Sequence, residues 1–312
     1  MNWKKKLATY ASLTVLATFI IHIINKLIYF MSTIDNLLGR KEGLYYEWRF
    51  GKIFYTKEGT GKPILLIHDL SACSSEYEWN RIVSDLSKKN TVYTLDLLGC
   101  GKSDKPNFTY TNFLYVQLVT DFINNVIGEK ADVIVTGNSC SFVLMACHNN
   151  DEIIDRILLI NPPSISSISK VPTKRTKMLK FIINIPFIGT LLFNLLHSKD
   201  SIEQTFMTEY FYNPQFVDDE IVKTYCESAQ ISKTQSKYLF ASIKGKYTTA
   251  NITECLTHID NSIFILVGSG NPTYKEYAQQ YQSYTPAIEV QTIKKSKIFA
   301  TIRGTRKKSS NR

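Results

Sequence analysis

Residues 132–143 read DVIVTGNSCSFV, and this stretch decides the fold. Its first half is a short apolar run that predicts a buried strand, and its second half opens a helical pattern. The two halves meet at Gly137-Asn138-Ser139-Cys140-Ser141, where a serine lies between small residues at alternate positions. A strand that turns sharply into a helix at such a segment forces the serine into a strained backbone conformation and lifts its hydroxyl above the sheet. We therefore expect Ser139 to project into a cleft.

The rest of the chain alternates strands with helices. A hairpin is predicted at 44–48 and 52–56 around Gly51, and the first buried strand reads PILLIH at 63–68. Further strands are expected at 91–98, 132–136, 157–160, 262–267 and 287–293, and helices at 77–89, 111–127 and 274–284. Strands that alternate with helices indicate βαβ crossovers. The fold class is therefore α/β, with a mostly parallel sheet that carries helices on both faces.

Two further motifs directly follow predicted strands. His68-Asp69-Leu70 comes after PILLI, and residues 96–106 read DLLGCGKSDKP. The carboxyl ends of parallel strands are where such sheets place their ligands. Together with 137–141 and Asn161-Pro162-Pro163, these motifs resemble the α/β-hydrolase superfamily, in its cap-bearing esterase, lipase and epoxide-hydrolase-like branch. The resemblance covers roughly residues 44 to 295.

The resemblance implies roles for particular residues. Ser139 stands at the position of the nucleophile, and the backbone N–H groups of Cys140 and Leu70 stand at the positions of the oxyanion donors, each worth ~3 kcal/mol in comparable enzymes. The family acid follows a late strand, where this chain reads GSGNP at 268–272 and has Asn271 in place of aspartate. Asparagine carries no charge to stabilise an imidazolium, and the equivalent exchange in a serine protease lowers turnover ~10⁴-fold.

The histidine base that the resemblance implies is missing. None of the five histidines follows the last predicted strand, where Ile298 stands near the family position of the base. His68 is expected to be structural, and His197 is the one substitute that we expect to be able to reach the cleft. The five are His22, His68, His148, His197 and His258.

A second departure lies beside the expected oxyanion hole. Asp69 replaces a family glycine, and a carboxylate that faced the site would oppose a developing negative charge. Two classes of function therefore stay open. One is a serine esterase or acyl hydrolase acting on a small hydrophobic ester. The other is a catalytically impaired pseudo-hydrolase that binds a hydrophobic ligand or acts as a scaffold. A dehalogenase or epoxide hydrolase is disfavoured, because those relatives have aspartate where this chain has Ser139.

The N-terminus carries an apolar segment. Leu7 to Ile24 contains no formal charge, and lysines flank it on both sides at 4–6 and at Lys26. Its length just reaches the hydrocarbon thickness of a bilayer. We predict an uncleaved single-pass membrane anchor at 1–30 in preference to a cleaved signal peptide, with an amphipathic helix lying in the interface as the alternative. The lysines on both sides leave the side of the membrane open.

The domain organisation follows from the strand pattern. A helical cap is predicted at 164–246, inserted into an α/β-hydrolase core at 31–163 and 247–298. Within the cap, 178–196 is strongly apolar but interrupted by Pro186 and Gly189, which favours a bent helix over a second span. This apolar cap is a candidate for contact with lipid.

Composition excludes other classes of protein. The net charge of +10 includes eight basic residues between Lys294 and Arg312, so about +2 remains for the rest, and no nucleic-acid partner is expected. The six cysteines form no CxxC pair, so neither a metal site nor a cofactor is predicted.

The basic tail at 299–312 replaces the segment L-P-x-x-E-x-P-E and the closing helix of the family. Codons that encode 299–308, when read one nucleotide later, can give LPQFEEPEK, so a shifted reading frame is our hypothesis for the tail.

Overall fold

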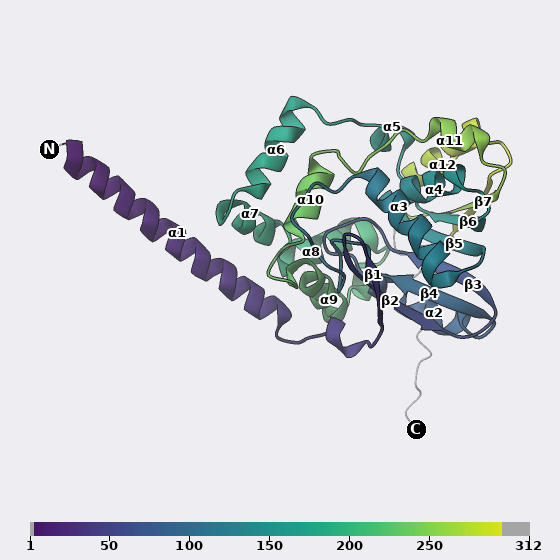
Figure 1. Ribbon diagram of the computed structural model, residues 1–312, viewed down its shortest axis with the longest axis horizontal. Helices are drawn as coiled ribbons and strands as arrows, with labels where there is room; N and C mark the ends of the chain where they lie inside the picture. The colour runs from purple at the N-terminus through teal and green to yellow at the C-terminus, as the bar shows by residue number, and fades with distance from the viewer. Residues whose placement is uncertain (1–2, 295–312) are drawn as a thin grey trace, which may run out of the picture.

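A single eight-stranded sheet forms the centre of the computed structural model, which describes residues 3–294 (Figure 1). The strand order is β1-β2-β4-β3-β5-β6-β7-β8. β1 pairs antiparallel with β2, and β2 pairs antiparallel with β4. The six strands β3 to β8 run parallel to one another. The strands are β1 (Leu44–Trp48), β2 (Gly51–Glu58), β3 (Lys62–Ile67), β4 (Asn90–Leu95), β5 (Ala131–Thr136), β6 (Ile154–Ile160), β7 (Ser262–Gly268) and β8 (Glu289–Ile293). The predicted α/β fold with a mostly parallel sheet is confirmed.

Helices cover both faces of this sheet because the central strands are apolar on both sides. Leu65 and Ile67 of β3 pack in one cluster with α3 (Asn112–Phe122) and α4 (Cys140–Asn149). Their neighbours Ile64 and Leu66 face the other side and pack with Trp79 and with α2 (Asn80–Leu86). The strands at the centre of the sheet thus end between two helical layers, with their carboxyl ends at one edge.

The chain between β6 and β7 is described throughout and contains helices only, as the sequence predicts. The helices there include α6 (Lys174–Asn184), α7 (Ile188–Leu196), α8 (Lys199–Thr205), α9 (Asp219–Gln230) and α10 (Lys237–Lys244). The short α5 (Ile165–Ile168) precedes them and α11 (Thr253–His258) follows them, while α12 (Thr273–Tyr284) joins β7 to β8. The axes of α6 and α7 differ by 100° across the break that contains Pro186. We call α6 to α10 the cap.

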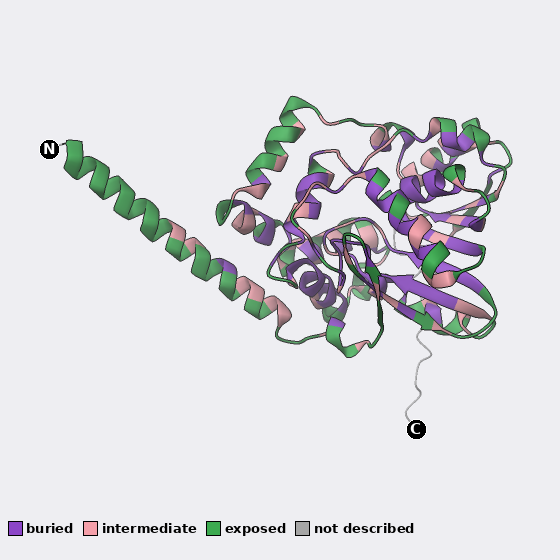
Figure 2. Cartoon of the chain, in the orientation of Figure 1, coloured by how far each residue is buried: buried purple, intermediate pink, exposed green. Residues whose placement is uncertain are grey.

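The first helix stands apart from this body. α1 (Trp3–Thr33) is longer than the predicted segment 7–24, and its first fifteen residues are exposed on all sides (Figure 2). By length and composition it is the one single helix in residues 3–294 that can cross a membrane, and the bent pair α6 and α7 passes the same test only when taken together. Ile298 and the predicted tail at 299–312 lie outside the described residues.

Candidate active site

The strand-to-helix turn after β5 differs from the prediction. The residue with the left-handed backbone is Gly137, with φ +55°, whereas Ser139 has helical angles of −69° and −19°. Residues Gly137–Ser139 form one 3-10 turn that leads directly into α4. Glycine adopts positive φ without steric cost, so the sharp turn falls on Gly137. The prediction of a strained Ser139 backbone is therefore wrong, and the turn lies two residues earlier.

The Ser139 hydroxyl is buried as a result. Its side chain is completely inaccessible, and Oγ donates a hydrogen bond of 2.6 Å to the carbonyl oxygen of His68. The prediction that this hydroxyl is lifted above the sheet is also wrong. A hydroxyl in this position satisfies a buried carbonyl and connects the start of α4 to the end of β3.

The two backbone N–H groups expected to form the oxyanion hole, those of Cys140 and Leu70, differ in their surroundings. The N–H of Cys140 donates to the carbonyl of Gly137 inside the 3-10 turn. It is therefore not free to act as the oxyanion donor that the resemblance implies. Asn138 is the exposed residue of the turn. Its N–H is bound to the Asp69 carboxyl, and Leu70, which follows β3, is buried.

A carboxylate of the chain itself accepts these N–H groups. Oδ1 of Asp69 accepts the backbone N–H of Asn138 at 2.7 Å and its side-chain amide at 3.1 Å. Burial raises the pKa of Asp69, while hydrogen bonds from Asn138 and from the backbone N–H of Leu70 act to lower it. The side chain therefore joins the turn after β3 to the turn after β5 and occupies the N–H of Asn138.

Glu78 hydrogen-bonds to the backbone of Asp69, and sequence reasoning missed it, because its only signal was an acidic residue beside Trp79. It follows the His68 turn in the 3-10 helix Glu76–Trp79. Its carboxyl accepts the Thr136 hydroxyl at 2.6 Å and the backbone N–H of Asp69 at 3.2 Å. Burial raises the pKa of Glu78 to about 8. A protonated Glu78 is the form that limits charge repulsion with Asp69.

The histidines provide no base for Ser139. His68 is fully buried, its Nε2 accepts the N–H of Leu97 at 3.1 Å and its Nδ1 bonds to the Asp69 carbonyl at 2.8 Å. Burial lowers the pKa of His68 to about 4, so this ring is neutral and structural, as predicted.

The remaining histidines lie elsewhere. His197 stacks on Phe193 at 4.1 Å between ring centroids and bonds to the Phe193 carbonyl, so it packs within the cap instead of reaching the cleft. His148 and His258 lie 6.0 Å apart, at the far end of α4. All five histidines are described, and none of their imidazole rings hydrogen-bonds to Ser139.

Asn271, which stands at the family acid position, has a local role. Its Oδ1 accepts the N–H of Thr273 at 3.1 Å, which satisfies a free donor at the start of α12. Asn161 likewise accepts the N–H of Gly268 at 3.0 Å and so joins the ends of β6 and β7. Within residues 3–294, Asn271 therefore orients no imidazole.

Aromatic residues surround the two buried carboxyls. Burial raises the pKa of Tyr210, of Tyr225 in the cap and of Tyr274 in α12, and the charge of Asp69 adds to each shift. Tyr225 also belongs to an apolar cluster of the cap, which consists of Ile202, Phe206, Phe211, Ile221, Val222, Tyr225 and Cys226. The side of the cap that faces the carboxyl ends of the strands is thus apolar and aromatic.

The sequence model of the alpha/beta hydrolase family matches residues 64–296. The chain belongs to this family. A curated relative is the 2-hydroxy-6-oxo-6-(2'-aminophenyl)hexa-2,4-dienoic acid hydrolase of Metapseudomonas resinovorans, 34% identical over 86 residues, which are 27% of this chain and 29% of the relative. The soluble epoxide hydrolase of a Corynebacterium species is 25% identical over 110 residues, 35% of this chain and 38% of that protein. The chain thus matches only about a third of the length of these relatives.

Solved structures extend the likeness of fold over more of the chain. A serine hydrolase involved in carbazole degradation superposes with a TM-score of 0.68 at 16% identity, over 84% of this chain and 93% of the other. The 2-hydroxy-6-oxo-6-phenylhexa-2,4-dienoate hydrolase of a Rhodococcus species gives 0.65 at 15% identity, with the same coverage. These hydrolases share the fold of this chain.

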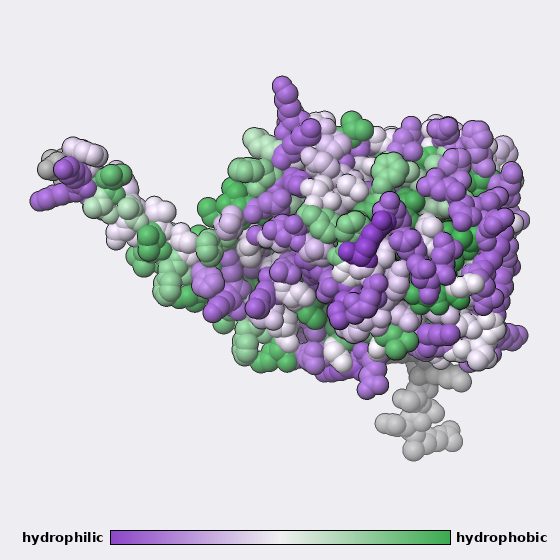
Figure 3. Space-filling view, in the orientation of Figure 1, coloured by the Kyte–Doolittle hydropathy of each residue, from purple (hydrophilic) through white to green (hydrophobic). Residues whose placement is uncertain are grey.

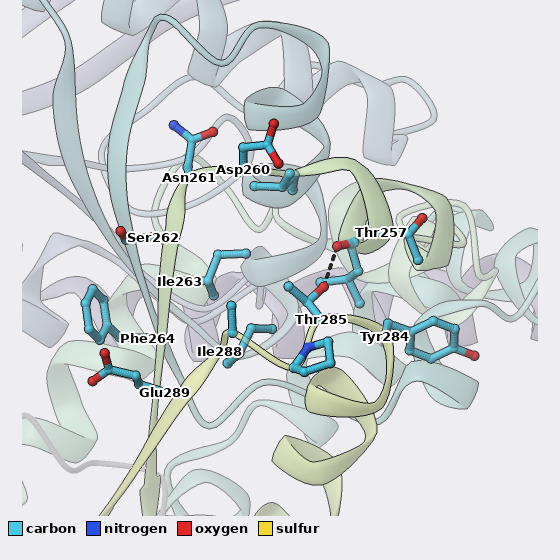
Figure 4. Close-up of a pocket in the computed structure, with 14 residues that line it drawn as sticks. Thr257, Asp260, Asn261, Ser262, Ile263, Phe264, Tyr284, Thr285, Ile288 and Glu289 are labelled. Carbon is cyan, nitrogen blue, oxygen red and sulfur yellow. Dashed lines mark hydrogen bonds between the residues drawn. The ribbon is translucent and has the colours of Figure 1, made fainter.

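A hollow of about 390 Å³ lies far from this site (Figure 4). It is lined by the first residues of β7 and β8, among them Ser262 and Glu289, and the Thr285 hydroxyl donates to the Leu256 carbonyl within it. Ligands of α/β-hydrolase sheets bind at the opposite, carboxyl ends of the strands. We therefore assign this hollow no role in the candidate site. Residues 3–294 contain no cluster of three His, Cys, Asp or Glu able to hold a metal ion.

Proposed function

We propose that this chain is a membrane-anchored pseudo-hydrolase, which does not cleave esters through Ser139 and binds a small hydrophobic ligand beneath its cap. The observation that carries the proposal is the Asp69 carboxyl, which accepts the N–H of Asn138 at 2.7 Å. An ester carbonyl placed there would meet an oxygen acceptor instead of two donors. Since each oxyanion donor contributes roughly 3 kcal/mol, their loss removes the largest electrostatic contribution to acyl transfer.

The state of the serine supports the same conclusion. A serine hydroxyl attacks only when a base can take its proton, and the Ser139 hydroxyl donates its hydrogen bond to the His68 carbonyl, which is not a base. Attack would also require the hydroxyl to leave a fully buried position. Hydrolysis through Ser139 is the alternative that membership of a hydrolase family favours, and the fluorophosphonate experiment below tests it.

The ligand class follows from the surfaces that face Asp69. Tyr210, Tyr225 and Tyr274 lie near enough to Asp69 for its charge to raise their pKa, and Tyr225 belongs to the apolar cluster of the cap, against which Tyr210 packs. Such linings with few polar groups are typical of sites for small apolar ligands. The relative from Metapseudomonas resinovorans is named for an aminophenyl-substituted acid, so we propose a small ligand with an apolar or aromatic part.

Membrane anchoring is proposed from α1. An exposed helix of this hydropathy is costly to leave in water, and its apolar part matches the hydrocarbon thickness. Extraction of membranes with alkaline carbonate tests it directly: the full chain is expected in the pellet, and release into the supernatant would contradict anchoring.

Catalytic competence is tested by labelling the purified full-length chain in detergent with a fluorophosphonate probe. We expect no labelling of either the natural chain or Ser139→Ala, while an active esterase in the same detergent is labelled. Circular dichroism confirms that the unlabelled protein is folded. Labelling that disappears in Ser139→Ala would overturn the pseudo-hydrolase proposal.

Ligand binding is tested by titrating the same protein with phenyl butyrate in a calorimeter. We expect binding without release of phenol, and we expect Tyr274→Ala to weaken it roughly 10-fold through loss of an aromatic contact. Tyr284→Ala is the matched control, because Tyr284 is on the same helix but lines the distant hollow. Equal effects of both substitutions would argue against a site beneath the cap.

A further inference from the structure

The second half of the helix α1 packs against the cap. Its packed face starts at Thr18 and continues through Ile21 and Asn25, which is the one buried residue of the helix. Lysines mark the two ends of the apolar part, and the distance from Lys6 to Lys26 corresponds to about 30 Å of helix, the thickness of the hydrocarbon core. A bilayer that holds α1 therefore ends close to Lys26, next to the cap.

The contact itself lies at this boundary. The ring of Phe187 meets His22 edge to face, with centroids 5.8 Å apart. The amide of Asn25 donates to the Phe187 carbonyl at 3.1 Å and accepts from Asn194 at 2.9 Å. These bonds fix the start of α7 against the part of α1 that leaves the bilayer.

The surface of the cap around this contact is apolar. Figure 3 shows hydrophobic side chains along α1 and on the neighbouring face of α6 and α7. The exposed large residues of this face are Met178, Leu179, Phe181, Ile182, Phe187, Ile188, Leu195 and Leu196. Lys174, Arg175, Lys177 and Lys180 accompany them on α6, which contains no acidic residue. Apolar residues with a basic rim are typical of a surface that rests on a bilayer.

Two hollows lie one above the other between α1 and the cap. The first, of about 410 Å³, is lined by Thr14, Val15, Thr18, Phe19, His22 and Phe187 and lies at the depth of the hydrocarbon. The second, of about 430 Å³, also contacts His22 and Phe187 but includes Lys26, Lys233 and Lys237. The pair thus forms a groove with an apolar end and a cationic end.

Lys237 is a buried cation that lines the second hollow. Its exposed fraction is 7%, and its Nζ donates to the Thr190 hydroxyl at 2.9 Å. Burial lowers the pKa of Lys237. No carboxylate lies within ion-pair distance of it among residues 3–294, although buried ammonium groups are normally paired.

The segment beside Lys237 is strained. Ser232, Lys233 and Thr234 have φ values of 64°, 56° and 65°, a left-handed conformation that residues other than glycine rarely adopt. Three such residues in succession cost of order 1–3 kcal/mol each, and strain of this kind concentrates at binding sites. This turn brings Lys233 to the second hollow.

We propose that this groove binds one anionic phospholipid of the leaflet, with its phosphate at Lys26, Lys233 and Lys237 and an acyl chain beside Val15 and Phe19. The proposal rests on the membrane anchoring proposed above. A zwitterionic lipid fits less well, because its own ammonium group would add a cation to three lysines. A free phosphate would leave the apolar hollow empty.

The experiment uses the full-length chain in dodecyl maltoside and measures its thermal unfolding midpoint. Dioctanoyl-phosphatidylglycerol is titrated in parallel with dioctanoyl-phosphatidylcholine and with glycerol phosphate. We expect a saturable rise of several degrees with the anionic lipid, because a ligand that binds only the folded state stabilises it, and little change with the other two.

Three variants locate the site. Lys237→Met and Lys233→Ala are expected to raise the half-saturating concentration of the anionic lipid about 10-fold each, since each removes a charge-assisted contact with the phosphate. Lys233 is exposed, so its variant folds even if Lys237→Met does not. Lys275→Ala, at an exposed position of α12, is the control and leaves the response unchanged.

Each other outcome contradicts the proposal. Equal stabilisation by phosphatidylcholine would show a nonspecific detergent-like effect, and saturation by glycerol phosphate would show a plain anion site. An unchanged response of Lys233→Ala would place the lipid elsewhere. Because binding is measured in detergent, a chain that is released by carbonate but binds the lipid would refute anchoring alone, and the reverse result would refute the lipid site alone.

Discussion

Replacing Glu78 by glutamine tests the electrostatics of the site. Glu78 is 4% exposed and accepts hydrogen bonds from Thr136 and from the backbone of Asp69. Burial raises the pKa of Glu78 from 4.5 to about 8. The folded chain therefore binds a proton that the unfolded chain releases at neutral pH. Glutamine has the same shape as the protonated carboxyl but cannot titrate.

The magnitude follows from this difference in pKa. A rise from 4.5 to about 8 corresponds to at most about 5 kcal/mol of stability. That contribution is fully present below pH 4.5 and is lost as the pH rises through about 8. Between about pH 6.5 and pH 9 the part that remains to be lost is roughly 2 kcal/mol.

Denaturant unfolding of the full-length chain in detergent, followed by tryptophan fluorescence, measures this loss. Trp79 is fully buried next to Glu78, so its emission reports on the site. Between about pH 6.5 and pH 9 the natural chain is expected to lose ~2 kcal/mol more than Glu78→Gln.

Comparing the two chains cancels the other groups that titrate. His68 and His197, for example, have pKa values lowered by burial to about 4, so each destabilises the fold as the pH falls from 6.5 to about 4. Equal pH profiles of the natural chain and Glu78→Gln would refute the protonated state of Glu78.

Three further substitutions test other parts of the structure. Ser139→Ala removes the hydrogen bond to a buried carbonyl and should lower the free energy of unfolding by about 1–2 kcal/mol in denaturant titrations. Glu227→Gln weakens the acceptor for the N–H groups of Leu37 and Leu38, at 2.7 and 3.2 Å, and should speed tryptic cleavage of the segment after α1. Burial acts to raise the pKa of Asp132, but hydrogen bonds from Arg156 and Lys62 outweigh it, so the pKa is lowered. The stability that this carboxylate contributes is therefore lost as the pH falls through the lowered pKa. In Asp132→Asn this acid-induced loss should disappear from the pH profile of the thermal midpoint.

The sheet could be predicted because buried parallel strands are apolar along their whole length. The runs at 63–68 and 132–136 show this pattern, and β3 and β5 occupy them within one residue at each end. The extent of α1 could not be predicted in the same way. Its residues after Ile24 are less apolar, and they are held as a helix by contacts with the cap, such as that of Asn25 with Asn194.

The turn after β5 could not be placed from the sequence. Gly137 and Ser139 are both small and both lie at alternate positions, so the spacing alone permits the sharp bend at either. What separates them is a neighbour distant in sequence: a Cβ at Gly137 would lie 2.3 Å from Oδ1 of Asp69. Only glycine therefore leaves room for that carboxyl, and this depends on how β3 and β5 lie side by side.

The buried serine and the occupied N–H of Asn138 are consequences of the same geometry. Asp69 reaches the N–H of Asn138 because the bend falls at Gly137, and that bend carries Ser139 into the first helical turn. A hydroxyl in that turn faces the end of β3, where the His68 carbonyl accepts it. Removal of the Asp69 carboxyl alone would free the donors but leave Ser139 buried and without a base. Restoring acyl transfer would thus require changes at the carboxyl, at the bend and at a base together, so a single substitution at Asp69 should not produce an esterase.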